Sequence, residues 1–235
     1  MARLTADLKR RDALTGEEIA RMWALFEAHY DAVSEMQFRA DLEEKDAALL
    51  ERDPSGAIQG FSTYRLIEGS PRCLFSGDTI IHPDWWGRND FARSWLENAG
   101  RIAAAGPEPL YWLLIVKGHR TYRYLPLFAK EFVPRAEAAT PALVELRDRL
   151  ARGRFGDWYD AEAGVVRFPE PRGQLRAALA AVPEKDRARR DVAFFLGANP
   201  GYVRGDELVC LTRLAPDNLT PIARRAFEAG QASPG

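Results

Sequence analysis

The sequence has few cysteines and few histidines. Its two cysteines, Cys73 and Cys210, stand far apart in apolar segments, so a disulfide framework is not expected and a CxxC-type metal site is excluded. Its three histidines show no metal-ligand spacing such as HExxH, so no bound metal is predicted. Both thiols are expected to be buried and structural.

The sequence also lacks long hydrophobic runs and an excess of either charge. No stretch approaches the roughly 20 apolar residues that a membrane-spanning helix needs, and the first residues carry charges in place of a signal-peptide core. The net charge is -1, from 33 Lys and Arg against 34 Asp and Glu, which gives no electrostatic basis for binding nucleic acid or acidic membranes. A cytoplasmic protein with neither partner is predicted.

What is present is an alternation of helical and strand patterns. Thr15 and Glu18 form a capping-box pattern, behind which apolar residues recur at helical spacing. A turn signal at 53–56 between two apolar runs predicts a hairpin. Helices are expected over 15–30, 34–45, 90–104, 119–132, 140–152, 174–181, 184–196 and 220–229, strands over 47–52, 57–67, 73–81, 110–116 and 207–214, and a small hairpin over 157–168.

Two of these strands should be parallel. The helix over 90–104 connects the strands 73–81 and 110–116, and a helical crossover between neighbouring strands requires them to run in the same direction. Consecutive strands without such a crossover should pair antiparallel. The sequence therefore predicts an α/β (α+β) fold whose mixed, mostly antiparallel sheet splays between the two parallel strands and leaves a cleft at 86–88.

The segment from Phe75 to Glu97 predicts an anion site. It reads as a strand, a Pro-Trp-Trp-Gly loop and an amphipathic helix that begins near Asp90. The unpaired N–H groups and the positive dipole end of such a helix favour phosphate or pyrophosphate. Arg88 and Arg93 could add charge-assisted hydrogen bonds. An ordinary strand–helix connection with exposed arginines is the alternative.

This order of elements, with an anion-binding loop that opens the helix after a core strand, resembles the GNAT acyltransferase superfamily. The resemblance covers about 15–132. It implies a donor-binding core over 1–135 and a helical and hairpin elaboration over 136–235 that completes the sheet within a single compact domain. The family's usual first strand is expected to be missing or degenerate, since Leu4 to Leu8 is a poor strand candidate.

The resemblance implies that acyl-CoA binds at the loop after the strand 73–81. The family's loop reads Gln/Arg-x-x-Gly-x-Gly/Ala, and its first glycine matches Gly87. The later glycine positions fall near Asn89, which tolerates a left-handed backbone, and near Phe91, whose ring would crowd a pyrophosphate. The donor-binding residues expected from the resemblance are Ile80, Ile81, Trp86, Gly87, Arg88, Asn89, Asp90 and Arg93.

Acyl transfer to an amine requires a base for the amine and a proton for the departing thiolate. Asp78, on the strand that enters the cleft, is a poor strand former and a candidate base; an Asp paired with an arginine is the alternative. His82, at the end of the same strand, is a second candidate base. The family's tyrosine acid aligns with Phe128, so Tyr124, or else Tyr122, is the expected acid.

The predicted function is transfer of an acyl group, expected to be acetyl, from acyl-CoA to an amine of a small molecule or a protein. Two alternatives stay open. The donor could be an acyl carrier protein or another bulky carrier, or the chain could be a non-catalytic member of the fold that binds a ligand. The region 136–205 could close over the cleft or form the surface of a homodimer.

Overall fold

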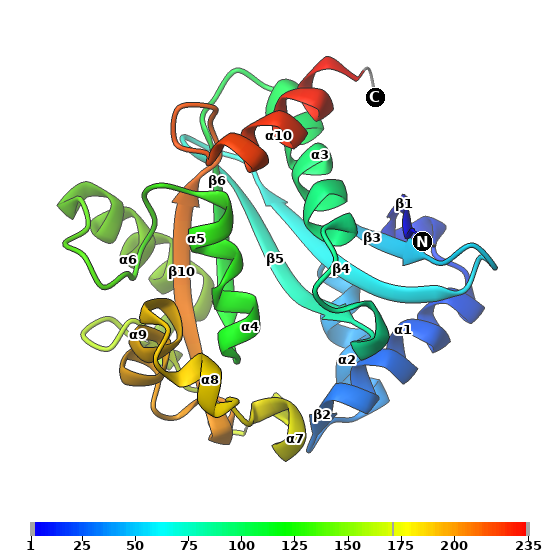
Figure 1. Cartoon of the computed structure of the whole chain (residues 1–235), viewed down its shortest axis with the longest axis horizontal. Helices are drawn as coiled ribbons and strands as arrows, with labels where there is room; N and C mark the ends of the chain where they lie inside the picture. Colours follow the sequence, from blue (N-terminus) through cyan, green and yellow to red (C-terminus); the bar gives the residue numbers. More distant parts are fainter. Residues whose placement is uncertain (1–2, 171, 234–235) are drawn as a thin grey trace.

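The protein folds around a mixed sheet with helices on both faces (Figure 1). The computed structural model describes residues 3–170 and 172–233. Eight strands form one sheet in the order β1-β3-β4-β5-β6-β10-β8-β7, and β2 pairs separately with β9. The strands are β1 (Thr5–Arg10), β2 (Tyr30–Asp31), β3 (Ala47–Arg52), β4 (Ile58–Ile67), β5 (Arg72–Ile81), β6 (Leu110–Val116), β7 (Tyr159–Asp160), β8 (Val165–Val166), β9 (Gln174–Leu175) and β10 (Glu207–Arg213). The α-helices are α1 (Gly16–His29), α2 (Glu35–Glu43), α3 (Asp90–Ala104), α4 (His119–Tyr122), α5 (Tyr124–Phe128), α6 (Pro141–Phe155), α7 (Ala177–Ala180), α8 (Glu184–Arg187), α9 (Arg190–Ala198) and α10 (Pro221–Ala232).

Local sequence signals set the first elements as predicted. Thr15 and Glu18 form a complete capping box at the start of α1. In the β3–β4 hairpin, the Asp53 carboxylate accepts hydrogen bonds from the N–H groups of Ser55 and Ala57, at 2.9 and 3.2 Å, which fixes the turn. The strand β3, the helix α3 and the strand β6 begin and end at the predicted residues.

The strands β5 and β6 are the parallel pair, and they separate part-way along. Their pairing runs from Arg72 opposite Leu110 to Ser76 opposite Leu114. The rest of β5, 77–81, lies beyond the last pair with β6 while it still pairs with β4. The two strands diverge towards the bottom of the view in Figure 1. The predicted mostly antiparallel sheet, splayed between two parallel strands, is confirmed.

The first strand of the sheet is present, which corrects the prediction that it is missing. β1 pairs antiparallel with β3 along its whole length. Four of its six side chains are exposed and half are charged, as is typical of an edge strand, and this composition hides it from a search for apolar runs. Glu18 of α1 fixes it in place by ion pairs with Lys9, at 2.6 Å, and with Arg52 of β3, at 2.5 Å.

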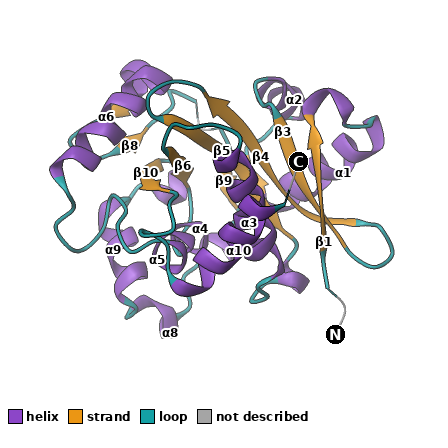
Figure 2. Cartoon of the chain, turned by 90° about the horizontal axis from the view of Figure 1, so that it is seen from above, coloured by secondary structure: helices purple, strands orange, loops and turns teal. Residues whose placement is uncertain are grey.

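The helices divide between the two faces of the sheet (Figure 2). The helices α3, α4, α5 and α10 cover one face, called the α3 face below. The helices α1, α2 and α6 cover the other, called the α6 face. Separate buried clusters lie under α3 and α10, under α1 and α2, and under α6.

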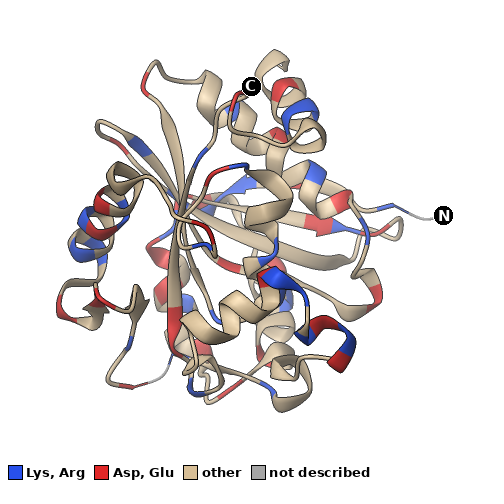
Figure 3. Ribbon diagram, turned by 60° about the vertical axis from the view of Figure 1, so that its left-hand side comes forward, with Lys and Arg blue, Asp and Glu red and all other residues tan. Residues whose placement is uncertain are grey.

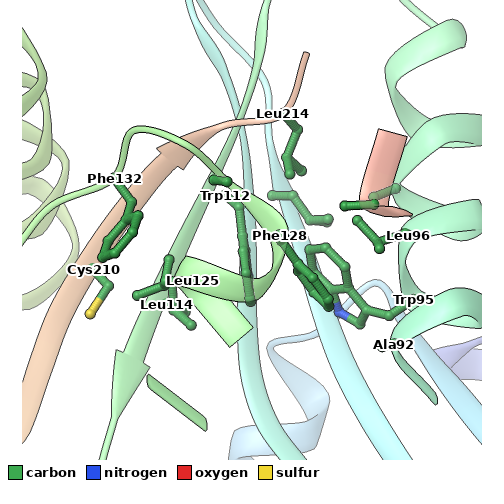
Figure 4. Close-up of a cluster of buried hydrophobic side chains, with 14 of the residues drawn as sticks. Ala92, Trp95, Leu96, Trp112, Leu114, Leu125, Phe128, Phe132, Cys210 and Leu214 are labelled. Carbon is green, nitrogen blue, oxygen red and sulfur yellow. The ribbon is translucent and has the colours of Figure 1, made fainter. Parts of the chain in front are cut away.

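Aromatic rings form the centre of the core on the α3 face (Figure 4). Trp95 of α3 packs on Trp112 of β6 with ring centroids 4.3 Å apart. Phe128 of α5 lies 5.8 Å from both rings and is 2% exposed. Burying a ring of this size stabilises the fold by about 2–3 kcal/mol. The contact therefore fixes α5 beside the open end of the parallel pair.

The C-terminal helix belongs to the same core. α10 crosses α3 so closely that a Cβ atom on Gly100 would collide with the carbonyl group of Phe227, and one on Gly230 with that of Glu97. Phe227 itself is fully buried. The strands β7, β8 and β10, all from the region after residue 135, extend the large sheet beyond β6. The C-terminal region and the preceding part therefore share one sheet and one core.

Three predicted helices are wrong in part. The helix expected over 184–196 is two helices, α8 and α9, with a break at 188–189. The helix expected over 119–132 is two short helices, α4 and α5, that break at Arg123. Pro126 causes the break, because it has no N–H to donate to the Tyr122 carbonyl group. From Ala129 the chain is extended and forms bridges with the C-terminal region. The helix expected over 174–181 begins instead as β9, because its first residues pair with β2.

Positively and negatively charged residues are interspersed along the elements (Figure 3), and the net charge is -1. Among the described residues, no helix combines the length and the hydropathy that a membrane span requires. Both cysteines are buried and free, and burial raises the pKa of the Cys73 thiol to about 12. They are structural thiols, as predicted.

Candidate active site

A cavity of about 710 Å³ opens where β5 separates from β6, within the usual range for small-molecule and cofactor sites. The loop 85–89 and the helices α4 and α5 form its wall on the α3 face. Tyr30 of β2 and Leu175 of β9 both line it, and the pairing of these two residues joins its opposite sides. Part of the C-terminal region therefore lines the predicted cleft.

The loop after β5 has a fixed shape. Gly87 has a φ of 75°, a left-handed conformation that favours glycine. The indole N–H of Trp86 donates to the carbonyl oxygen of Ile81 at 2.7 Å, and the Arg120 guanidinium lies over the same ring at 4.7 Å. The loop is thereby held between the end of β5 and the helix α4.

The start of α3 differs from the expectation at one residue. Asn89, the N-cap residue, has a φ of -91°, so the prediction that it supplies a left-handed backbone is wrong, and Gly87 supplies it instead. Phe91 is 5% exposed and packs on Tyr124 with ring centroids 5.8 Å apart. Phe91 also lines the cavity, so its ring borders both the core and the site. The first-turn N–H groups of α3 have no carbonyl partner within the helix.

Guanidinium groups outnumber carboxylates on this side of the cavity. Arg123 and Arg189 both pair with the one carboxylate of Asp191, at 3.3 and 3.5 Å. Arg88 stacks on the ring of Trp85 at 4.3 Å. All of these residues line the cavity. An excess of guanidinium groups beside a helix N-terminus suits an anion with several negative charges, such as a pyrophosphate.

Asp78 lies in a β-bulge at the point where the strands separate. Gly77 and Asp78 both stand opposite Thr63 of β4, whose hydroxyl accepts the Asp78 N–H at 3.1 Å. A bulge of this kind redirects side chains, and the Asp78 side chain lines the cavity. Burial raises the pKa of its carboxyl group, while the ammonium groups of Lys45 and Lys117 lower that pKa to a smaller extent.

A second carboxylate in the cavity, Glu207, was not found by sequence analysis. It is 4% exposed at the start of β10, and it pairs with Lys117 at 3.3 Å. Lys117 also donates to the carbonyl oxygen of Arg172 at 2.6 Å. The antiparallel pairing of β10 with β6 brings Glu207 beside Lys117. Their separation in the sequence gives no sign of this contact, so only the fold reveals it.

The two candidate tyrosines have different surroundings. Tyr124 lines the cavity, and burial raises the pKa of its hydroxyl to about 12, with a smaller contribution from the Glu51 carboxyl group. Tyr122 is 1% exposed, lies outside the cavity lining and donates its hydroxyl to the carbonyl oxygen of Pro134 at 2.9 Å. Phe128, where the family's tyrosine was expected to align, is in the aromatic core. Of the three positions 122, 124 and 128, Tyr124 is therefore the one whose side chain lines the cavity.

Most of the expected donor-binding residues line the cavity, but two of them, and one candidate base, lie outside its lining. Arg93 pairs with Glu97 at 3.3 Å on the exposed side of α3, and Asp90 also lies outside the lining. His82 is outside it too, and its Nδ1 accepts the N–H of Asp84 at 3.4 Å. The cavity is lined by Ile80, Ile81, Trp86, Gly87, Arg88 and Asn89.

The described part of the chain contains no group of three or more His, Cys, Asp or Glu side chains placed to hold a metal ion. No protein-family model matches the sequence, and a search of curated proteins finds no match.

A comparison of whole structures aligns this chain with solved structures of several acyltransferases. The GNAT family N-acetyltransferase YhbS from Escherichia coli, in complex with CoA, is 12% identical and aligns over 92% of this chain and 84% of its own, with a TM-score of 0.42. A probable N-acyltransferase from Enterococcus faecalis is 12% identical over 55% of this chain, with a TM-score of 0.39, and the alignment spans 33% of its own length. A GNAT family acetyltransferase from Brucella melitensis, in complex with acetyl-CoA, is 13% identical over 50% of this chain and 81% of its own, with a TM-score of 0.35.

Similarities at this level assign neither an activity nor a substrate to the chain. In the sheet itself, a helical crossover joins a parallel pair of strands that separates beside the loop after β5. Its strand order and splayed parallel pair give the sheet that the resemblance to the GNAT acyltransferases predicts.

Proposed function

We propose that this protein is an N-acyltransferase that takes an acyl group, expected to be acetyl, from acyl-CoA and transfers it to an amine of a small molecule or a protein. One observation carries the proposal. A single cavity joins a wall of loop amides and arginine side chains, suited to phosphates, to a carboxyl group, that of Asp78, at the point where β5 leaves β6.

The donor would lie along the loop and the unpaired part of β5. The N–H groups at Gly87 and at the start of α3, together with Arg88, Arg123 and Arg189, would hold the phosphates. The acyl thioester would then reach the space between Asp78 and Tyr124, which both line the cavity. A bound donor in this position leaves the α6 face of the cavity open for the acceptor.

Asp78 and Tyr124 would move the protons of the reaction. The neutral amine attacks the thioester carbonyl carbon and forms the N–C bond, and its surplus proton passes to Asp78. The C–S bond then breaks, and the thiolate takes a proton from Tyr124. The phenolate regains a proton from water, and Asp78 releases one. Because burial raises its pKa, the Asp78 carboxylate is a stronger base than an exposed one.

Thermal unfolding with and without acetyl-CoA tests the donor. A ligand that binds only the folded state stabilises it by about 2.7 kcal/mol at 100 times its Kd, so the melting temperature should rise with the acetyl-CoA concentration. Acetyl-pantetheine, which lacks the nucleotide phosphates, should have a weaker effect. An equal shift from both compounds would favour a donor on a carrier protein. No shift from either, with no CoA retained in native mass spectrometry, would contradict the proposed function.

A further inference from the structure

The cavity continues through the gap between β5 and β6 to the α6 face of the sheet. On that face it is lined by Phe75 of β5 and Phe155 of α6. A second cavity of about 560 Å³ adjoins it there, and the two share Asp41, Asp78 and Arg172 in their linings. The second cavity is lined by none of the residues of the proposed donor wall. It therefore has room for an acceptor of the size of an amino acid or larger.

Two cationic groups lie at the end of this volume, over the same ring. The Lys45 ammonium is 6.0 Å from the centroid of Phe75, and the Arg154 guanidinium is 5.4 Å from it. Lys45 is buried, and its hydrogen bond goes to a neutral group, the main-chain carbonyl of Asp41, at 2.9 Å. Lys45 forms no ion pair in the described part of the chain, although its charge lowers the pKa of Asp78, and a buried ammonium without a paired carboxylate favours an incoming anion.

Arg154 supplies an unsatisfied donor at the same place. Its Nη2 pairs with Glu44 at 2.6 Å, on the outside of the cavity. Its Nε–H is buried and has no hydrogen-bond partner among the described residues. A buried donor without an acceptor costs about 1–3 kcal/mol. A carboxylate placed over Phe75 would accept from this N–H and would neutralise Lys45 at the same time.

A carboxylate, that of Asp78, lies further along β5 than the ring of Phe75 on which the two cations lie. Asp78 follows Phe75 by three residues, and because the bulge at 77–78 shortens the strand, the two lie less than about 10 Å apart. The other buried carboxylate, Glu207, is already paired with Lys117, and Asp41 pairs with Arg172 at 3.4 Å. Among these three carboxylates, that of Asp78 has no ion pair in the described part of the chain, so it remains available to an amine.

We infer that the acceptor carries a carboxylate as well as an amine, with the carboxylate bound by Lys45 and Arg154 and the amine directed to Asp78. The inference rests on the proposed function and narrows its acceptor to amino acids and short peptides. The rings of Phe75, Phe155 and Phe168 along the same cavity add apolar contact for the part of the acceptor between its charged ends.

Acetyl transfer to matched acceptor pairs tests the inference. The panel consists of the twenty common L-amino acids, the dipeptides Gly-Gly and Gly-Phe, and the carboxamide of each, assayed by thiol release from acetyl-CoA. For the best acceptor, kcat/KM should exceed that of its carboxamide by at least about tenfold, the effect of one charged hydrogen-bonded contact. Arg154→Met should reduce this ratio towards one. Arg149→Met, an exposed arginine on the same helix, should keep the wild-type ratio.

The result separates the inference from the proposed function. If acetyl-CoA binds but the carboxamides react as well as the acids, the inference is overturned and the transferase is not. The same holds if acetyl-CoA binds and no member of the panel is acetylated. If Arg154→Met and Arg149→Met both keep the wild-type ratio, Arg154 does not bind the carboxylate and the inference fails. If acetyl-CoA does not bind at all, the proposed function fails and the inference with it.

Discussion

The indole N–H of Trp112 donates to the hydroxyl of Ser76 at 2.8 Å, in the buried centre of the sheet. Ser76 is the last residue of β5 that pairs with β6, and Trp112 lies on β6 with its ring against Trp95. The hydrogen bond therefore joins the two parallel strands at the end of their paired part. Beyond it the strands separate and the cavity begins.

Replacing Ser76 should destabilise the protein at this junction. Ser76→Ala leaves the Trp112 N–H buried without an acceptor, so the free energy of unfolding should fall by about 1–3 kcal/mol. Urea unfolding followed by tryptophan fluorescence measures it. Ser55→Ala, in the exposed β3–β4 turn, is the control and should change stability by less than about 0.5 kcal/mol. Equal losses from the two variants would show that the Ser76 contact has no special role.

The two tyrosines should respond differently to the loss of their hydroxyl groups. Tyr124→Phe should reduce turnover by about 100-fold or more, as expected for removal of a general acid. Tyr122→Phe should leave turnover near that of the wild type, and should lower stability by about 1 kcal/mol because Pro134 loses its donor. Similar small effects on turnover in both variants would mean that neither tyrosine acts as the acid.

Asp78 should set the acid side of the pH–rate profile. A base acts in its ionised form, so turnover should rise with pH through the pKa of Asp78, which burial raises above the ordinary value for Asp. In Asp78→Asn this rise should disappear and turnover should fall by about 100-fold or more. Asp84→Asn, in the exposed loop, serves as the control. An Asp78→Asn profile like that of the wild type would make Asp78 a structural residue.

Glu51 should make the protein less stable as the pH rises. Both of its carboxyl oxygens are buried and lack a hydrogen-bond partner among the described residues, and burial raises its pKa from 4.5 to about 7. Between these values the folded state binds more protons than the unfolded state, so the free energy of unfolding should fall as the pH rises, by up to about 3 kcal/mol.

Glu51→Gln tests this pH dependence directly. The amide resembles the protonated acid, so the variant should match the wild type near pH 4.5 and be more stable than it at pH 8. Urea unfolding at the two pH values measures the difference. A wild type that is equally stable at both values, or a variant that is less stable at pH 8, would contradict the account of a carboxyl group buried without compensation.

The sequence predicts elements whose signals are local. The capping box at Thr15, the Asp53 turn and the apolar run 110–116 each depend on neighbouring residues, and all three are found where expected. The edge strand β1 could not be predicted in this way, because its charged residues are stabilised by pairing with β3 and by Glu18. The short strand β9 reads as a helix for the same reason, since its partner β2 lies far away in the sequence.

Some residues of the candidate site could likewise be predicted from local sequence, and others could not. Gly87, Asp78 and Tyr124 could be selected from the sequence, because each follows or lies on an element that borders the cleft. The contact of Glu207 with Lys117 depends on the pairing of β10 with β6. The role of Arg154 depends on how α6 packs over Phe75, which no local pattern encodes. The acceptor side of the site could therefore be found only in the folded chain.

The most direct test of the central claim is a calorimetric titration of the protein with CoA. The account predicts saturable one-to-one binding in the wild type and, for Gly87→Glu, affinity at least about tenfold weaker, a difference of 1.4 kcal/mol, because a charged side chain and a strained backbone replace the loop glycine. Gly56→Glu, at an exposed hairpin glycine with a similarly positive φ of 87°, should bind CoA as the wild type does. No binding by the wild type, or equal binding by the wild type and Gly87→Glu, would contradict the claim.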